Sequence, residues 1–244
     1  AANKLVLGQI KTDAKSNEIT AIPELLALLD IKGCLVSIDA MGCQTEIAET
    51  ILQQGGDYLL AVKGNQPKLF EAVRQALAPL AATPLCAETM TLEKAHGRID
   101  GREYHVMAAG ELAAQFPHWK QLHSIGVAIS YRVENMQKIT IEQRYFISSK
   151  ALVQDEFARA VRGHWAIENS LHWVLDVTMG EDDCPIYRGD AAEILACIRH
   201  MGLNMLRAET SRKASVRRKQ KIAGMSSEYL ETVLNAGLKK LGEI

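Results

Sequence analysis

The pattern that most constrains the fold is an apolar run, an amphipathic helix and a second apolar run in close succession. The runs are Cys34–Ile38 and Asp57–Val62, and the helical pattern between them covers Thr45–Gln54. Short apolar runs flanked by turn residues are typical of buried strands. A strand, a helix and a strand with short joints form a βαβ unit, whose strands are parallel neighbours. The sequence therefore predicts an α/β fold.

Polar residues follow both predicted strands. Asp39 comes directly after the first strand, and Lys63, Asn65 and Gln66 follow the second. Open α/β sheets bind their ligands at the carboxyl ends of the strands, so we expect these residues at one edge of the sheet. An alternative for Asp39 is that it closes a turn or caps a helix before residues 41–42.

The residues on either side of this unit read as further regular elements. Lys4–Ile10 is short and β-rich and predicts a strand. A helix opens at Asn17 and stops before Gly33, and residues 68–82, rich in Ala and Leu, predict another helix.

The character of the sequence changes after Pro84. Residues 124–133 and 138–147 alternate apolar and polar side chains around a turn near Asn135, and Asp100-Gly101 is a typical hairpin dipeptide. We therefore expect a mostly antiparallel, β-rich insertion over residues 88–149. It separates a part over residues 1–87 from a helical part over residues 150–244, with helices expected at 151–178, 190–209 and 226–241.

One of these helices carries acid and histidine where a buried helix carries apolar side chains. At about 100° per residue, His164, Glu168, His172 and Asp176 form a stripe beside an apolar arc. Glu168 therefore lies at the margin of a buried face, where a carboxylate needs a partner such as a metal ion or a second acid. An ion pair of Glu168 with Arg162 or His172 is the alternative.

Asp39 and Glu168 together fit two-metal phosphoryl transfer. In that chemistry, carboxylates far apart in sequence hold Mg²⁺ or Mn²⁺ near a scissile phosphate, and the ions activate a water or a 3′-hydroxyl. A helical row of histidine and acid is no recognised zinc signature. A structural metal-binding protein is therefore only the third interpretation, which elemental analysis for zinc would test.

Composition limits the classes of function. The formal net charge is −1, so a nucleic-acid role must rest on local patches. The five cysteines are scattered and contain no C-x-x-C, which favours reduced thiols and a cytoplasmic location. No apolar run approaches the roughly 20 residues of a membrane helix.

One basic tract stands out near the carboxyl end. It holds a single acid, Glu209, and is a candidate for contacting DNA phosphates. The alternative is a solvated helix end or loop. Its seven basic residues are Arg207, Arg212, Lys213, Arg217, Arg218, Lys219 and Lys221.

Four segments resemble one family. Residues 38–44, 58–66, 145–149 and 164–182 are similar to the H-repeat-associated transposases of bacterial Rhs elements, which belong to the insertion-sequence DDE transposases. The resemblance spans nearly the whole chain. It implies an RNase H-like catalytic core interrupted by a β-rich insertion, Mg²⁺-dependent DNA strand cleavage and joining, and a triad of metal-binding acids.

The resemblance also assigns residues and partners. It makes Asp39 the second acid of the triad and Glu168 the third, and it places Lys63, Asn65 and Gln66 in the same crevice. The implied partner is DNA, as transposon ends and as target. Because transposition pairs two ends, the resemblance favours a homodimer.

The chain departs from the family pattern around the glutamate. Related enzymes carry Tyr-x2-Arg-x3-Glu-x6-Lys, and the corresponding positions here are Val161, His164, Glu168 and Leu175. Arg162 or His164 is then the candidate to replace the DNA-contacting arginine.

The first aspartate of the family pattern lies on a strand upstream of Lys4–Ile10. Asp13, in a predicted loop, is a poor substitute for it. We therefore expect a transposase domain truncated at its N-terminus, which binds metal weakly and is inactive in this form. The alternative is a noncatalytic DNA-binding remnant that uses the basic tract and the insertion.

Overall fold

The computed structural model describes all residues except 1–4, 11–17, 82–90, 96–97, 135–137, 187 and 243–244. The chain divides into two compact units. The sheet unit comprises residues 12–164, and the helical unit comprises residues 1–11 with 165–244. Each unit is described by itself.

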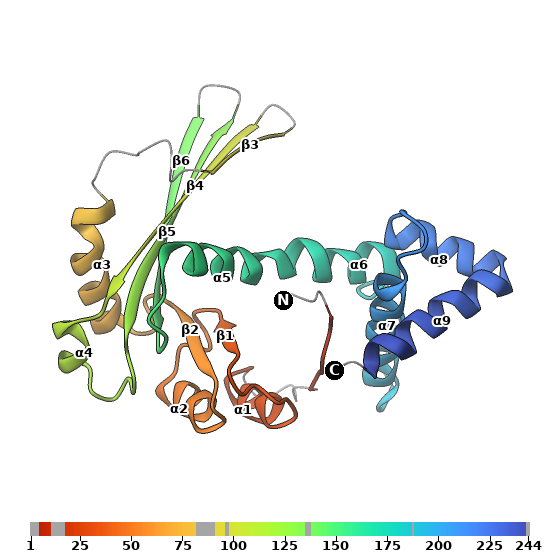
Figure 1. The fold of residues 1–244 in the computed structure, drawn as a ribbon, viewed down its shortest axis with the longest axis horizontal. Helices are drawn as coiled ribbons and strands as arrows, with labels where there is room; N and C mark the ends of the chain where they lie inside the picture. Colours follow the sequence, from red (N-terminus) through yellow and green to blue (C-terminus); the bar gives the residue numbers. More distant parts are fainter. Residues whose placement is uncertain are drawn as a thin grey trace. The chain divides into compact units, whose positions relative to one another are not determined.

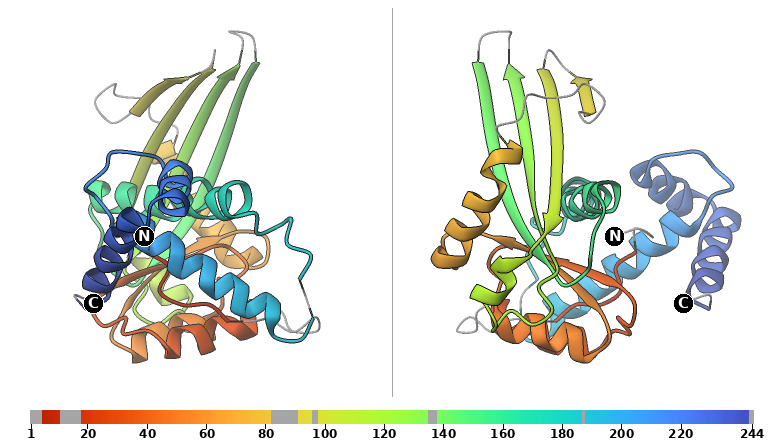
Figure 2. Two further views of the ribbon diagram at one scale, coloured as in Figure 1. Left: turned by 90° about the vertical axis from the view of Figure 1, so that its right-hand side faces the viewer. Right: turned by 60° about the vertical axis from the view of Figure 1, so that its left-hand side comes forward.

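The sheet unit contains a curled sheet with helices on both faces (Figures 1 and 2). Its elements in chain order are α1 (Glu18–Ala27), β1 (Leu35–Ile38), α2 (Thr45–Gln53), β2 (Asp57–Val62), α3 (Pro67–Ala81), β3 (Thr91–Ala95), β4 (Arg98–Ala108), α4 (Glu111–Gln115), β5 (Ser124–Glu134), β6 (Lys138–Ser148) and α5 (Gln154–Ile167), whose last turn enters the helical unit.

The strands follow the order β1-β2-β6-β5-β4-β3. β1 and β2 are parallel, with Ile38 opposite Leu60, as the βαβ pattern predicted. Every other pair is antiparallel, and β2 meets β6 with Leu60 opposite Ile147. The strands predicted for the insertion thus continue the same sheet as β1 and β2. The α/β class is confirmed as a mixed sheet with helices.

The core of the sheet unit lies between one face of the sheet and the helices α2 and α3. Strand β2 is buried from Tyr58 to Val62, and α2 packs against it, whereas α3 packs against β5 and β6. The buried side chains of this core include Ile47, Ile51, Leu60, Leu69, Val73, Leu77, Ile125, Val127 and Ile147.

Helix α5 packs on the opposite face through one aromatic side chain. The buried ring of Phe157 makes edge contacts with Phe146, at 5.6 Å between centroids, and with Tyr104, at 6.3 Å. Gly126 of β5 lies directly beneath it, where a Cβ would come within 2.6 Å of Phe157 Cζ. The glycine therefore lets the helix approach the sheet.

One predicted turn is wrong. Asp100 and Gly101 lie inside β4 rather than at a hairpin turn. The β3–β4 register pairs Ala95 with Arg98, so residues 96–97, outside the described part, join the strands. Asp100 is stabilised within the strand because its carboxylate accepts a hydrogen bond from Arg132 Nε at 3.1 Å on the neighbouring strand.

The helical unit packs three helices around a small core. Its elements are the π-helical segment η1 (Glu168–His172), α6 (Trp173–Met179), α7 (Ala191–Ala208), α8 (Val216–Met225) and α9 (Ser227–Leu241). The core contains Leu206, Tyr229 and Val233. Gly237 of α9 packs so closely on Met205 that a Cβ would lie 2.3 Å from its Cγ.

Two features of this unit differ from the sequence expectations. Residues 5–10 form no strand; instead, the side-chain amide of Asn204 bonds the backbone N–H and carbonyl of Val6 at 2.9 and 2.8 Å. The π-helical turn at Glu168–His172 interrupts the α-helical spacing, so the predicted continuous stripe from His164 to Asp176 does not hold.

No helix within the described ranges is long and apolar enough to cross a membrane.

The packing of α5 on the sheet yields a prediction. We expect Gly126→Ala to lower the free energy of unfolding by about 1 to 3 kcal/mol, because the new methyl group must displace Phe157. Gly64→Ala is the matched control, since a Cβ there meets no atom within 4 Å. Urea unfolding followed by circular dichroism measures both, and equal midpoints for the two variants would contradict the packing argument.

Candidate catalytic site at the carboxyl ends of the parallel strands

Asp39 and Lys63 follow two neighbouring parallel strands. Asp39 comes one residue after β1 ends, and Lys63 comes one residue after β2 ends. Parallel strands end at the same edge of a sheet, so the structure brings these two residues to one edge, where α/β sheets bind ligands. Lys63 is exposed, and its ammonium group has no partner among the described residues.

The carboxylate of Asp39 is held on one side by a tight turn. Its Oδ1 accepts a hydrogen bond from the Gly42 amide at 3.3 Å. Only glycine fits at position 42, because a Cβ would lie 2.3 Å from Ile38 Cγ2. Asp39 therefore does close a turn before residues 41–42, which was the alternative interpretation of this residue. Its Oδ2 has no hydrogen-bond partner in the described part of the chain, so the exposed carboxylate keeps one oxygen for a ligand.

Asn65 and Gln66 contact the loop that carries Asp39. Asn65 Nδ2 donates to the Ala40 carbonyl at 2.6 Å, and Gln66 Nε2 donates to the Cys43 carbonyl at 3.0 Å. The sequence placed both amides in the crevice but gave no indication of these contacts. They tie the loop after β2 to the loop after β1.

The end of α5 inside the sheet unit is also tied to β1. Ser37 Oγ lies 3.2 Å from His164 Nδ1, a hydrogen-bond distance. Ser37 is two residues before Asp39, and His164 is four residues before Glu168 in the sequence. His164 was a candidate for contacting DNA, and the structure gives its ring a partner on β1.

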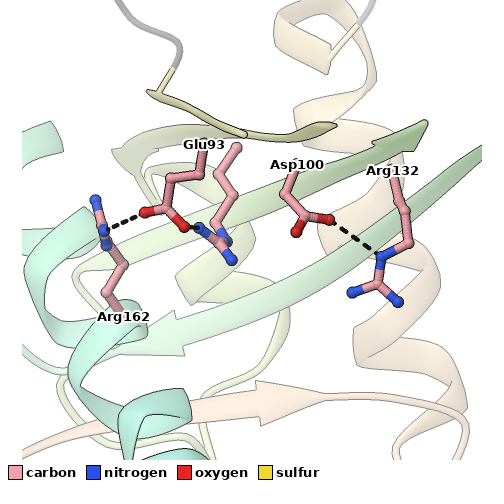
Figure 3. Close-up of polar contacts among 5 residues, drawn as sticks. Glu93, Asp100, Arg132 and Arg162 are labelled. Carbon is pink, nitrogen blue, oxygen red and sulfur yellow. Dashed lines mark hydrogen bonds and ion pairs between the residues drawn. The ribbon is translucent and has the colours of Figure 1, made fainter. Parts of the chain in front are cut away.

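Arg162, the other candidate to replace the arginine of the family pattern, is held by β3. The Glu93 carboxylate forms ion pairs with Arg162 at 3.1 Å, drawn in Figure 3, and with Arg102 at 3.1 Å. The hydrogen bond and charge of Arg102, with the charge of Arg162, hold the pKa of the Glu93 carboxyl below its usual value. This ion pair joins the edge of the sheet to α5, as the Asp100–Arg132 pair, also drawn in Figure 3, joins β4 to β5.

Glu168 begins the π-helical segment, and its side chain lies outside the described part. π-helical turns are frequent at functional sites. The described residues contain no group of three or more acids, histidines or cysteines that could hold a metal ion. Asp39 Oδ2 is a carboxylate oxygen at this edge that can serve as a metal ligand, and the pairing of Asp39 with Glu168 stays a prediction.

The basic tract runs from Arg207, in the last turn of α7, to Lys221, inside α8. Lys219 is only 7% exposed and forms an ion pair with Glu209 at 3.1 Å. Its amine also donates to the carbonyls of Leu206 and Glu209. The guanidinium of Arg212 lies over the Tyr229 ring, 5.1 Å from its centroid. We therefore concentrate the DNA-binding prediction on Lys213, Arg217 and Arg218, whose side chains are exposed, as are those of Arg212 and Lys221.

Glu209 is the residue that sequence reasoning missed in this tract. Its carboxylate is 1% exposed and accepts hydrogen bonds from Tyr229 Oη at 2.6 Å, Ser211 Oγ at 2.5 Å and the Arg212 amide at 3.1 Å. Burial raises its pKa, but these bonds and Lys219 outweigh burial and lower the pKa to about 2. The sequence feature that could have indicated this role is that Glu209 is the single acid among the seven basic residues of the tract.

Comparisons with known proteins agree with the motifs. The family model for the transposase DDE domain matches residues 1–205. The chain is 48% identical over 238 residues to the "H repeat-associated putative transposase YhhI" of Escherichia coli K12, covering 95% of this chain and 63% of that protein. It is 47% identical over 244 residues to the "Putative transposase YncI" of Escherichia coli O157:H7, covering 98% of this chain and 62% of that protein. The chain therefore spans about three fifths of the length of these relatives. The resemblance drawn from the motifs is confirmed.

The Glu209 network yields a prediction about pH. A carboxylate whose pKa is lower in the folded than in the unfolded state stabilises the fold above its unfolded pKa and loses that contribution as pH falls. We expect Glu209→Gln to destabilise the helical unit by about 3 to 5 kcal/mol at neutral pH, because it leaves Lys219 buried without its partner.

The difference in free energy of unfolding between the parent chain and Glu209→Gln should shrink as pH falls from 4.5, the ordinary pKa of a glutamate carboxyl, towards about 2. Urea unfolding at several pH values, followed by helical circular dichroism, measures it. Tyr229→Phe, which removes one hydrogen bond, is the control, with a loss of about 1 kcal/mol. A difference that stays constant across this pH range would refute the role of the Glu209 charge.

Proposed function

Because this chain belongs to the transposase DDE domain family, we propose that it is part of a DNA transposase that cleaves and joins DNA strands with a divalent metal ion. The observation that carries the proposal is the family match over residues 1–205, a range that includes both Asp39 and Glu168. We further propose an RNase H-like core, transposon ends and target DNA as substrates, and a homodimer that pairs two ends.

Asp39 and Glu168 are the acids that we assign to metal binding. Carboxylate oxygens are the ligands that Mg²⁺ and Mn²⁺ prefer. Two such ions, when bound, would stabilise the charge on the scissile phosphate and activate the attacking water or 3′-hydroxyl. In support, Asp39 stands at the end of a parallel strand with one carboxylate oxygen unpartnered within the described residues.

The chain's own residues position the substrate. The Gly42 amide fixes Asp39 Oδ1, so that the carboxylate does not have to be ordered when DNA binds. Lys63 offers an exposed charge at the same edge for a phosphate. Ser37 and Glu93 hold the side chains of His164 and Arg162 within the sheet unit.

Strand cleavage tests the acid assignment. We expect Asp39→Asn and Glu168→Gln each to reduce metal-dependent cleavage of labelled transposon-end DNA by at least about a hundredfold, since several kcal/mol of charge stabilisation depend on the ions. The assay compares the 244-residue chain with a version extended upstream by a strand that carries an aspartate. Glu46→Gln, on the exposed face of α2, is the control with unchanged cleavage. Cleavage that survives Asp39→Asn would sink the assignment.

A second candidate function, noncatalytic DNA binding, is favoured by the exposed bases around α8. Lys213, Arg217 and Arg218 are exposed in the helical unit, and α8 starts with a cap in which Ser215 accepts from the Arg218 amide at 3.3 Å. Such a surface binds phosphates without choosing bases.

Salt dependence tests this DNA contact. We expect neutralising Lys213, Arg217 and Arg218 to weaken DNA binding and to reduce the slope of log affinity against log salt by up to about 3. Lys32→Gln, an exposed lysine of the sheet unit, should leave the slope unchanged. If the noncatalytic interpretation holds, Glu168→Gln leaves both affinity and slope unchanged and no variant of the chain cleaves DNA.

A further inference from the structure

We infer that Asn65 and Gln66 are positioning residues for the Asp39 carboxylate, an inference that rests on the proposed function. Their side-chain amides connect the loop that follows β2 to the loop that follows β1. Asn65 donates to the Ala40 carbonyl at 2.6 Å, and Gln66 donates to the Cys43 carbonyl at 3.0 Å.

The two carbonyls are the ends of one short turn. The Ala40 carbonyl also accepts from the Cys43 amide at 3.2 Å, which closes the turn over residues 40–43. Inside it, the Gly42 amide donates to Asp39 Oδ1. Asn65 and Gln66 therefore hold the first and last residues of the turn whose third residue holds the carboxylate.

The backbone that carries these two side chains is itself held by hydrogen bonds. The Gln66 backbone N–H donates to the Lys63 carbonyl at 3.0 Å, and the Gln66 backbone carbonyl accepts from the Phe70 N–H at 2.8 Å in the first turn of α3. The Phe70 ring packs edge-on against Tyr145 of β6, 5.4 Å between centroids. The amide side chains thus extend from a helix start that is packed on the sheet.

Within the turn, the Gln44 backbone N–H also donates to the Gly42 carbonyl at 2.9 Å, and Gly42 is buried. Cys43, the last residue of the turn, is fully buried, whereas Asp39 and Met41 are exposed. Gln44, the residue before α2, makes no side-chain capping bond and donates to the Met41 carbonyl at 3.3 Å. The orientation of Asp39 therefore depends on the two amides, because a carbonyl that loses its donor in this loop can turn to water.

Two neutral variants test the inference without changing charge. Asn65→Leu and Gln66→Met keep approximate size and remove the amide donors. Gln115→Met, the same change on the exposed face of α4, is the matched control. We expect hydrogen exchange at the Gly42 and Cys43 amides, measured by NMR on the whole chain, to rise about five- to tenfold in the first two variants, the factor for one lost hydrogen bond.

Kinetics on the cleavage-competent version separate positioning from DNA contact. We expect kcat to fall about tenfold or more while KM and the dissociation constant for transposon-end DNA stay unchanged. A weaker DNA complex with unchanged exchange at Gly42 would overturn the inference and make these amides DNA contacts. Unchanged exchange in both variants overturns it as well.

Failure of the proposed function gives a different result. If Asp39→Asn leaves cleavage intact, the acid assignment is wrong, while the exchange rates at Gly42 and Cys43 still show whether the amides hold the turn. A fall in kcat together with an equal fall for Gln115→Met would also refute a specific positioning role.

Discussion

The pairing of β2 with β1 on one side and β6 on the other holds the sheet unit together. β2 is buried from Tyr58 to Val62, so its backbone donors and acceptors have to be satisfied within the sheet. The parallel pair with β1 brings Asp39 and Lys63 to one edge. The antiparallel pair with β6 attaches the long hairpins and the face on which α5 packs through Phe157. The position of the candidate site thus follows from the burial of one strand.

Elements with local, periodic signals could be predicted, and elements defined by distant partners could not. The strand at 57–62 agrees with its prediction because a short apolar run between turn residues has few other solutions. Residues 5–10 carry the same β-rich composition, but within them Val6 bonds to Asn204, almost two hundred residues away, instead of to a strand. Asp100-Gly101 remains inside β4 because Arg132 satisfies the carboxylate from the next strand. The sequence pattern of each segment alone contains neither partner.

The same division applies to the candidate site. The pattern of apolar runs in the sequence located the end of β1, and with it the position of Asp39. The bonds from Asn65 to Ala40 and from Gln66 to Cys43 depend on how closely two loops approach, which residue spacing alone does not determine. The π-helical turn at Glu168 is equally invisible to a period of 3.6 residues, although it decides where the residues after it point.

In the helical unit, one buried ion pair determines which cations face the solvent. Lys219 is drawn inward to Glu209, and this fixes the rotation of α8 about its own axis. Because successive residues in a helix turn by about 100°, Arg217 and Lys221 then lie on the side opposite Lys219. Both are exposed, and they are four residues apart, so their charges are neighbours on one face. The lone acid of the tract therefore removes one cation from the surface and orients the cations that remain, so Glu209 and Lys219 shape the surface that we propose for DNA binding.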